Sequence, residues 1–92
     1  MTELEEMIRA ADAKHLLANE MLREALQVIE DNVVNKLAEA DLAPDRILKL
    51  QAILAGKRAF QKYLNMVIQT GKLAEEAEKQ KRSIADRILR RA

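Results

Sequence analysis

Apolar residues recur at steps of three and four along most of this chain, the spacing that places side chains on one face of an α-helix. The runs predict four helices, over residues 3–17, 20–40, 44–69 and 72–90. The sequence therefore predicts an all-α fold, organised as one helical domain that covers residues 1–92.

Short polar residues and a proline mark the predicted starts of these helices. Thr2 and Glu5 have the spacing of a capping box, in which the threonine hydroxyl accepts from the backbone N–H of Glu5. Asn19 favours the N-cap position, so we expect a break there, with one uninterrupted helix over residues 3–40 as the alternative. Pro44 suits the first turn of the next helix.

The two glycines interrupt helical patterns and need separate explanations. Gly71 follows the strong apolar run, so we predict that it ends a helix in the left-handed conformation, before a short basic helix over residues 72–90. Gly56 lies inside a predicted helix, where glycine costs about 1 kcal/mol relative to alanine. It predicts a close helix–helix approach, with a weak point in an ordinary helix as the alternative.

The two long helices are joined by a short turn, which predicts an antiparallel hairpin. Their apolar arcs are wider than one hairpin contact covers, so the surplus faces need the short N-terminal helix or a second copy of the chain. We expect an oligomeric helical bundle, either a dimer or a higher ring. The predicted interface residues are Leu22, Leu26, Ile29, Val33, Leu37, Ile47, Leu50, Leu54, Phe60, Leu64 and Val67.

Composition narrows the classes of protein and of chemistry. The absence of cysteine excludes disulfides, thiolate catalysis and cysteine-ligated zinc. No run approaches the ~18–20 apolar residues of a membrane span, and the acidic N-terminus is unlike a signal peptide. We therefore expect a soluble cytoplasmic protein that has no membrane partner.

The net charge of +1 hides a division between the two halves of the chain. Residues 1–43 carry ten acidic and four basic side chains, a balance of −6, whereas residues 44–92 carry five acidic and twelve basic, a balance of +7. A basic half can bind phosphates or an acidic protein. We favour a simpler interpretation, in which the basic residues form a solvated helix end. The scarcity of aromatic residues that could stack on bases argues against nucleic-acid binding. The candidate contacts are Lys57, Arg58, Lys62, Lys79, Lys81, Arg82, Arg87, Arg90 and Arg91.

Candidate residues for catalysis or metal binding are few. Asp12 and His15 have the spacing of carboxylate–histidine metal motifs, but a site needs three or four ligands and the chain has one histidine. We interpret His15 as a partly buried structural residue. Neighbouring carboxylates in the sequence point about 100° apart on a helix, so they do not form a pair for acid–base catalysis. Gly56-Lys57 lacks the remaining residues of a P-loop, so no nucleotide-binding loop is indicated. We expect no catalytic residue, cofactor or metal, and no enzyme activity.

Two stretches together carry a resemblance to a family. Residues 11–19, which end in Leu-Leu-Ala-Asn and run into residues 21–26, are followed much later by Val-Ile-Gln-Thr-Gly-Lys-Leu-Ala at residues 67–74. This order resembles small all-helical phage and prophage proteins encoded among head-assembly and DNA-packaging genes, over most of residues 4–80. That family often has proline where this chain has Glu20. The resemblance implies no catalytic residue.

The resemblance implies that the protein takes part in phage head assembly or DNA packaging, and we consider three candidate functions. The first is a non-enzymatic accessory protein of phage head morphogenesis or DNA packaging, which oligomerises and docks on a coat, portal or terminase protein. The second is a DNA-binding regulator or a small-terminase-like protein, and the third is an inhibitor of a host defence protein. In each case we expect the protein in the cytoplasm of the infected host cell, and in the first also in the virion.

Overall fold

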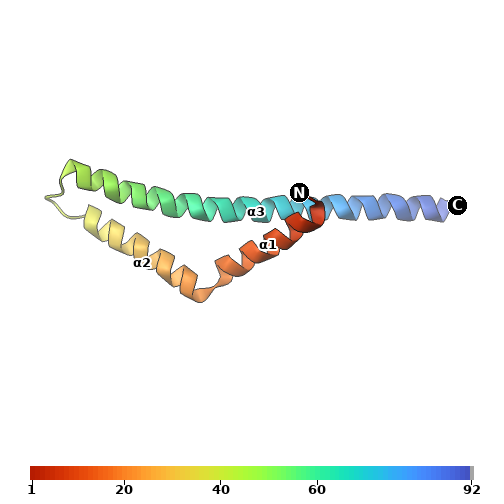
Figure 1. Ribbon diagram of the computed structural model, residues 1–92, viewed down its shortest axis with the longest axis horizontal. Coiled ribbons are helices and arrows are strands. Elements are labelled where there is room, and N and C mark those ends of the chain that lie inside the picture. The colour runs from red at the N-terminus through yellow and green to blue at the C-terminus, as the bar shows by residue number, and fades with distance from the viewer. Residues whose placement is uncertain (92) are drawn as a thin grey trace. The chain divides into compact units, whose positions relative to one another are not determined.

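The computed structural model describes residues 1–91 and consists of helices joined by short connections (Figure 1). Helix α1 spans Glu3–Ala18, α2 spans Glu20–Leu37 and α3 spans Pro44–Arg91. No strand is present among these residues, so the fold class is all-α.

The contacts divide the chain into two compact units, where the sequence analysis expected one domain. Unit 1 consists of Met1–His15 and the chain from Leu64 onward, so that most of α1 packs on the second part of α3. Unit 2 is Leu16–Tyr63 and contains α2 and the first part of α3, which lie alongside each other (Figure 1). Each unit is described separately below.

The first two helix starts are capped by the side chains that the sequence indicated. The backbone N–H of Glu5 donates to the Thr2 hydroxyl over 3.2 Å. Asn19 is the N-cap of α2: its backbone is extended, and its side-chain oxygen accepts from the N–H of Leu22 over 2.9 Å. The break predicted at Asn19 is therefore present, and the alternative of one uninterrupted helix is wrong.

The connection between α2 and α3 is longer than predicted, because α2 ends at Leu37 instead of continuing to residue 40. After Leu37 the N–H of Glu39 bonds to the carbonyl of Lys36, a tighter turn than an α-helix makes. The next helix begins at Pro44, whose missing N–H costs nothing in the first turn.

Gly71 does not end a helix, so the predicted division into helices over residues 44–69 and 72–90 is wrong. Helix α3 runs continuously through this position to Arg91, and no glycine in residues 1–91 has a positive φ angle. A Cβ added at Gly71 would overlap the Cβ of Ala10 and lie 2.9 Å from the carbonyl oxygen of Glu6. The glycine therefore permits close approach of α1 to α3.

Gly56 has the opposite environment from the one predicted within this chain. A Cβ added at Gly56 would have no heavy atom within 4 Å, and the residue is exposed. No close approach inside the chain explains this glycine.

The interior of both units is narrow, and in unit 1 it is made largely of small residues. The buried apolar side chains of the described chain belong to six residues, three of which are alanine. In unit 1, Ala10 and Ala13 of α1 are buried, as are Leu64, Gly71 and Ala74 of α3. In unit 2 the buried residues are Val33 and Leu50, with half-buried leucines on either side. Small residues let helix backbones approach closely but bury little apolar area each.

Candidate interaction surface

Lys57 is the one predicted DNA or acidic-partner contact that the structure places inside a helix contact. Its Nζ atom lies 2.6 Å from Oε2 of Glu30 on α2, and its side chain is 9% exposed. An ammonium held between α2 and α3 is not available to a phosphate. Lys57 is therefore removed from the candidate set and assigned a structural role in unit 2.

Most of the other predicted basic contacts are exposed, but they belong to different units. Arg58 and Lys62 lie on α3 in unit 2, and the remaining six lie on α3 in unit 1. Two of those six are already engaged: Lys79 pairs with Glu75 at 3.5 Å, and Lys81 pairs with Glu3 at 2.9 Å. The exposed arginines past this point are Arg82, Arg87, Arg90 and Arg91.

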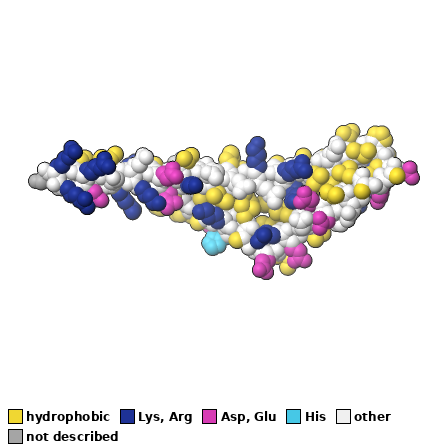
Figure 2. All heavy atoms as spheres, turned by 180° about the vertical axis from the view of Figure 1, so that it is seen from behind, with side chains coloured by type: hydrophobic (Ala, Val, Ile, Leu, Met, Phe, Trp, Pro, Cys, Tyr) yellow, Lys and Arg dark blue, Asp and Glu magenta, His cyan; other side chains and the backbone are white. Residues whose placement is uncertain are grey.

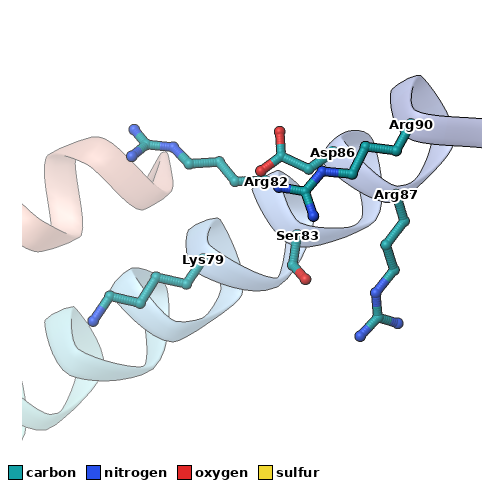
Figure 3. Close-up of a pocket in the computed structure, with 6 residues that line it drawn as sticks. All are labelled: Lys79, Arg82, Ser83, Asp86, Arg87 and Arg90. Carbon is teal, nitrogen blue, oxygen red and sulfur yellow. The ribbon is translucent and has the colours of Figure 1, made fainter.

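Figure 3 shows how the basic side chains are arranged on the last part of α3. Lys79, Arg82, Arg87 and Arg90 line a surface depression together with Ser83 and Asp86, all from this one helix. The side chains of Arg82 and Arg87 extend in different directions, so the group does not converge on one point. This geometry suits a diffuse attraction to a polyanion better than a pocket for one small anion.

The N-terminus of α1 is held to α3 by a cluster of three charged groups in unit 1. The ammonium of Lys81 donates a hydrogen bond to Glu3 and, together with a hydrogen bond from Glu78, lowers the pKa of Glu3. The same hydrogen bond between the carboxyl groups raises the pKa of Glu78. The ion pair with Glu3 raises the pKa of Lys81. We therefore expect docking of α1 at this end to depend on pH.

Most of the predicted oligomer-interface residues pack within the chain itself. Val33, Leu50 and Leu64 are buried, so for these three the interface prediction is corrected: they form the core. Leu22, Leu26, Leu37, Ile47, Leu54 and Val67 are half-buried. Only Ile29 and Phe60 of the predicted set are exposed, and their contact with a second copy stays a prediction.

Large apolar side chains outside the predicted set are exposed in both units. In unit 2 the outward side of α3 carries Leu48, which is 67% exposed, and Tyr63, which is 49% exposed. Figure 2 shows hydrophobic side chains at the surface near the α2–α3 connection, and Lys and Arg along the C-terminal part of α3. The sequence analysis missed Leu48 and Tyr63 because it followed only the strongest apolar period of this helix.

No metal-binding group is found in the part of the chain that the structure describes. Residues 1–91 contain no set of three or more His, Cys, Asp or Glu side chains placed to hold a metal ion. His15 is exposed, so the expectation of a partly buried structural histidine is wrong. Within the same residues, no helix has both the length and the apolar character that crossing a bilayer requires.

Comparisons with family models, with curated proteins and with solved structures find no match to this chain. The resemblance to small phage proteins therefore rests on the sequence stretches alone.

Proposed function

We propose that this protein is a non-enzymatic assembly protein that acts by associating with itself and by docking on a larger partner. The observation that carries the proposal is the imbalance between what is buried and what is exposed. The buried apolar side chains are few and half of them are alanine, whereas large side chains such as Leu48, Met21 and Leu73 are more than 60% exposed.

Exposed apolar residues scattered singly are ordinary on a soluble protein, but a continuous apolar surface marks an interaction site. On α3 in unit 2, four large apolar side chains are exposed over about four turns of one helix, namely Leu48, Ile53, Phe60 and Tyr63. These side chains are 42–67% exposed, so covering the exposed part of each would contribute about half of the ~1.5–3 kcal/mol that full burial of an exposed side chain provides. Self-association therefore offers stabilisation that the thin interior lacks.

The arginines near the end of α3 support docking on an acidic partner. Past the Lys81–Glu3 ion pair, every residue from Arg82 to Arg91 is exposed. This basic segment, residues 82–91, presents four arginines against the single carboxylate of Asp86. Its charge would steer the protein to a negatively charged surface at low ionic strength.

The resemblance to head-assembly and packaging proteins supplies the setting of the proposal. In that setting the larger partner would be a phage coat, portal or terminase protein, and the protein would act in the infected host cell, including on the forming virion. The apolar faces would set the oligomer, and the basic segment would hold it to the partner.

DNA binding is the second candidate function, and the exposure of the same arginines favours it. Each phosphate that an arginine neutralises adds to an affinity that falls steeply with salt. Stacking aromatics are scarce, since Phe60 and Tyr63 are the aromatic residues of the chain. DNA contact would therefore be independent of base sequence.

Two measurements test the proposal. Sedimentation velocity from nanomolar to micromolar concentration should show an oligomer that forms with increasing concentration, and a folded monomer throughout the range would overturn the proposal. Titration with duplex DNA at several salt concentrations separates the two candidates. Salt-sensitive binding supports DNA contact, and no binding at low salt removes that alternative.

A further inference from the structure

A groove runs along the contact between α1 and the second part of α3, entirely within unit 1. It consists of two adjoining depressions of about 460 and 480 Å³, and Met7 and Glu75 line both of them. On the α1 side the groove extends from Leu4 to Lys14, a length of about 15 Å at 1.5 Å per residue. This groove, called here the unit 1 groove, therefore has the length of about three turns of another helix.

Apolar side chains from both helices line the unit 1 groove. On α1, Leu4 is 64% exposed and Met7 is half-buried, and on α3 Ile68 is half-buried. Ala11 of α1 adds a small exposed side chain between the two depressions' polar residues. An amphipathic helix that lies in the groove would cover these side chains with its own apolar residues, which is a common way for proteins to bind a helix.

The unit 1 groove also carries a surplus of positive charge. Four cations line it, together with two carboxylates that are already engaged within the chain. Glu75 pairs with Lys79 at 3.5 Å, and Glu78 forms a hydrogen bond with Glu3. Three of the four cations are in no ion pair within residues 1–91, two of them in one depression and one in the other. They are Lys14 and Lys72, and Arg82.

Helix α2 presents an acidic and partly apolar face that no part of its own unit covers, called here the α2 outer face. With about 100° of rotation per residue, eight residues of α2 lie within an arc of about 140° that is directed away from the buried Val33. All eight are exposed, and Arg23 and Lys36 lie outside the arc. The complete face consists of Glu20, Met21, Glu24, Ala25, Val28, Asp31, Asn32 and Asn35.

The α2 outer face has the side chains that a helix needs to bind in a groove. Met21, Ala25 and Val28 are spaced by four and three residues, and Met21 is 72% and Val28 49% exposed. The face carries three carboxylates and no basic residue. Its apolar residues and its negative charge therefore both match the lining of the unit 1 groove.

The spacing of the charges matches as well as their sign. Lys72 and Arg82 are ten residues apart on α3, which is about 15 Å, and Glu20 and Asp31 are eleven residues apart on α2, which is about 16 Å. Between the two cations the groove carries Glu75, and the α2 outer face has no carboxylate between Glu24 and Asp31. Attraction at both ends is therefore combined with little repulsion in the middle.

We propose that the α2 outer face of one copy of the chain lies in the unit 1 groove of a second copy. The proposal rests on the proposed function, of which it names the two self-association surfaces. The entering helix belongs to a second copy, because α2 is joined to its own α1 through the single residue Asn19 and belongs with the first part of α3 in unit 2. The contact joins two different surfaces, so copies associate either reciprocally as a dimer or head-to-tail as a ring.

Charge reversal on either surface tests the pairing. Glu24→Lys with Asp31→Lys, the α2 variant, and Lys14→Glu with Lys72→Glu, the groove variant, should each raise the dissociation constant of self-association at least about tenfold. The controls reverse the same charges elsewhere, in Glu39→Lys with Asp41→Lys and in Lys49→Glu with Lys62→Glu, and should leave it unchanged. All eight positions are exposed, so circular dichroism should show unchanged helix content in every variant.

Mixing the two variants gives a result that loss of folding cannot produce. In an equimolar mixture, the reversed α2 outer face of one variant meets the reversed groove of the other, and both natural surfaces meet as well. The mixture should therefore associate as tightly as the natural protein, although each variant alone does not. A single chain that carries all four substitutions should associate in the same way. Failure of both to restore association would overturn the pairing.

Photochemical cross-linking locates the contact without depending on charge. The natural sequence contains no cysteine, so Ala11→Cys places a benzophenone label on one residue of the unit 1 groove. Irradiated with isotope-labelled natural protein, it should form adducts with labelled residues between Glu20 and Asn35. Ala55→Cys with the same label, at an exposed position of α3 in unit 2, is the control and should not form them. Adducts of Ala11→Cys with other labelled segments only would overturn the pairing.

The outcomes separate this inference from the function on which it rests. If sedimentation shows that the natural protein is a monomer throughout the concentration range, both the proposed function and the pairing are overturned. If the natural protein is an oligomer whose dissociation constant neither the α2 variant nor the groove variant changes, the pairing alone is overturned.

Discussion

Gly71 of α3 and Ala10 of α1 are so close that no side chain fits between them. A Cβ at Gly71 would overlap the Cβ of Ala10, and it would also lie 2.9 Å from the carbonyl oxygen of Glu6. The carbonyl belongs to the α1 backbone, which cannot give way as a flexible side chain can. The position of α1 in unit 1 therefore requires a residue without a side chain at position 71 of α3.

Gly71→Ala and Gly56→Ala should change stability in opposite directions. At Gly71 the added methyl group must push α1 away, which should lower the free energy of unfolding by about 1–3 kcal/mol. At Gly56 the methyl group meets nothing in the single chain, so the higher helix propensity of alanine should raise it by about 0.5–1 kcal/mol. Urea unfolding at low protein concentration, where the chain is monomeric, measures both.

The two alanine variants control for each other, because the chemical change and the helix are the same. If Gly71→Ala were as stable as the natural protein, the close contact between α1 and α3 would be contradicted.

Removing one partner of the Lys57–Glu30 pair should destabilise unit 2. Glu30→Ala leaves the ammonium of Lys57, whose side chain is 9% exposed, without its carboxylate, which should lower the free energy of unfolding by about 1–3 kcal/mol. Lys57→Met keeps the length of the side chain and should lower the free energy of unfolding less than Glu30→Ala does, because an apolar residue can be accommodated between α2 and α3. In a double-mutant cycle by urea unfolding, the double variant should cost less than the sum of the single ones, and simple additivity would contradict the ion pair.

Glu78→Gln should stabilise the docking of α1 at neutral pH and should lose this effect in acid. The pKa of Glu78 is raised by its hydrogen bond with Glu3, so its contribution to stability is lost as pH rises through that pKa. Glutamine keeps a neutral hydrogen-bonding group at every pH. The variant should therefore melt at a higher temperature than the natural protein at pH 7, and the difference should vanish near the ordinary glutamate pKa of 4.5.

Glu3 makes the docking of α1 less stable in acid, which is the opposite of the pH dependence that Glu78 produces. The hydrogen bond from Lys81 lowers the pKa of Glu3. The contribution of Glu3 to the stability of α1 docking is therefore present above the ordinary glutamate pKa of 4.5, and it is lost as pH falls through the lowered pKa. The two groups together should make the docking of α1 most stable near pH 4.5. Thermal unfolding monitored by circular dichroism from pH 3 to 7 measures this, with Glu76→Gln, an exposed neighbour, as the control. An equal shift for Glu78→Gln at all pH values would contradict the cluster.

Neutralising the basic segment should weaken binding to an acidic partner or to DNA. Replacing Arg87 and Arg90 by glutamine removes two exposed positive charges and no ion pair between α1 and α3. If DNA is the partner, the slope of log affinity against log salt should fall by roughly 0.9 for each phosphate that the variant no longer neutralises. Lys36→Gln, an exposed change on α2, is the control and should leave the slope unchanged.

The helix starts could be predicted from the sequence because their causes are local. Asn19 caps α2 through the N–H of Leu22, three residues away, and Pro44 opens α3 through its own ring. The roles of the glycines could not be predicted, because the reason for Gly71 is Ala10, about sixty residues earlier in the chain. Local patterns made Gly71 a helix end and Gly56 a contact inside the chain.

The candidate surfaces were predicted in part, for a related reason. The period of three and four identified Leu50 and Val33 as residues that must be covered, but it could not say whether the neighbouring helix of the same chain or a second copy covers them. It likewise marked Lys57 as basic without indicating that Glu30 would neutralise it. Which side chains remain exposed depends on pairings between distant segments, and these appear only in the structure.

The continuity of α3 past Gly71 determines the azimuth of the arginines that follow. Each residue along an unbroken helix is turned by about 100° from the one before it. Arg82, eleven residues after Gly71, comes back to the azimuth that faces α1, whereas Arg90 points about 100° away from it. The direction in which this positive charge would meet a partner is therefore set by the number of residues along the helix, and one residue inserted after Arg82 would turn Arg90 by about 100°.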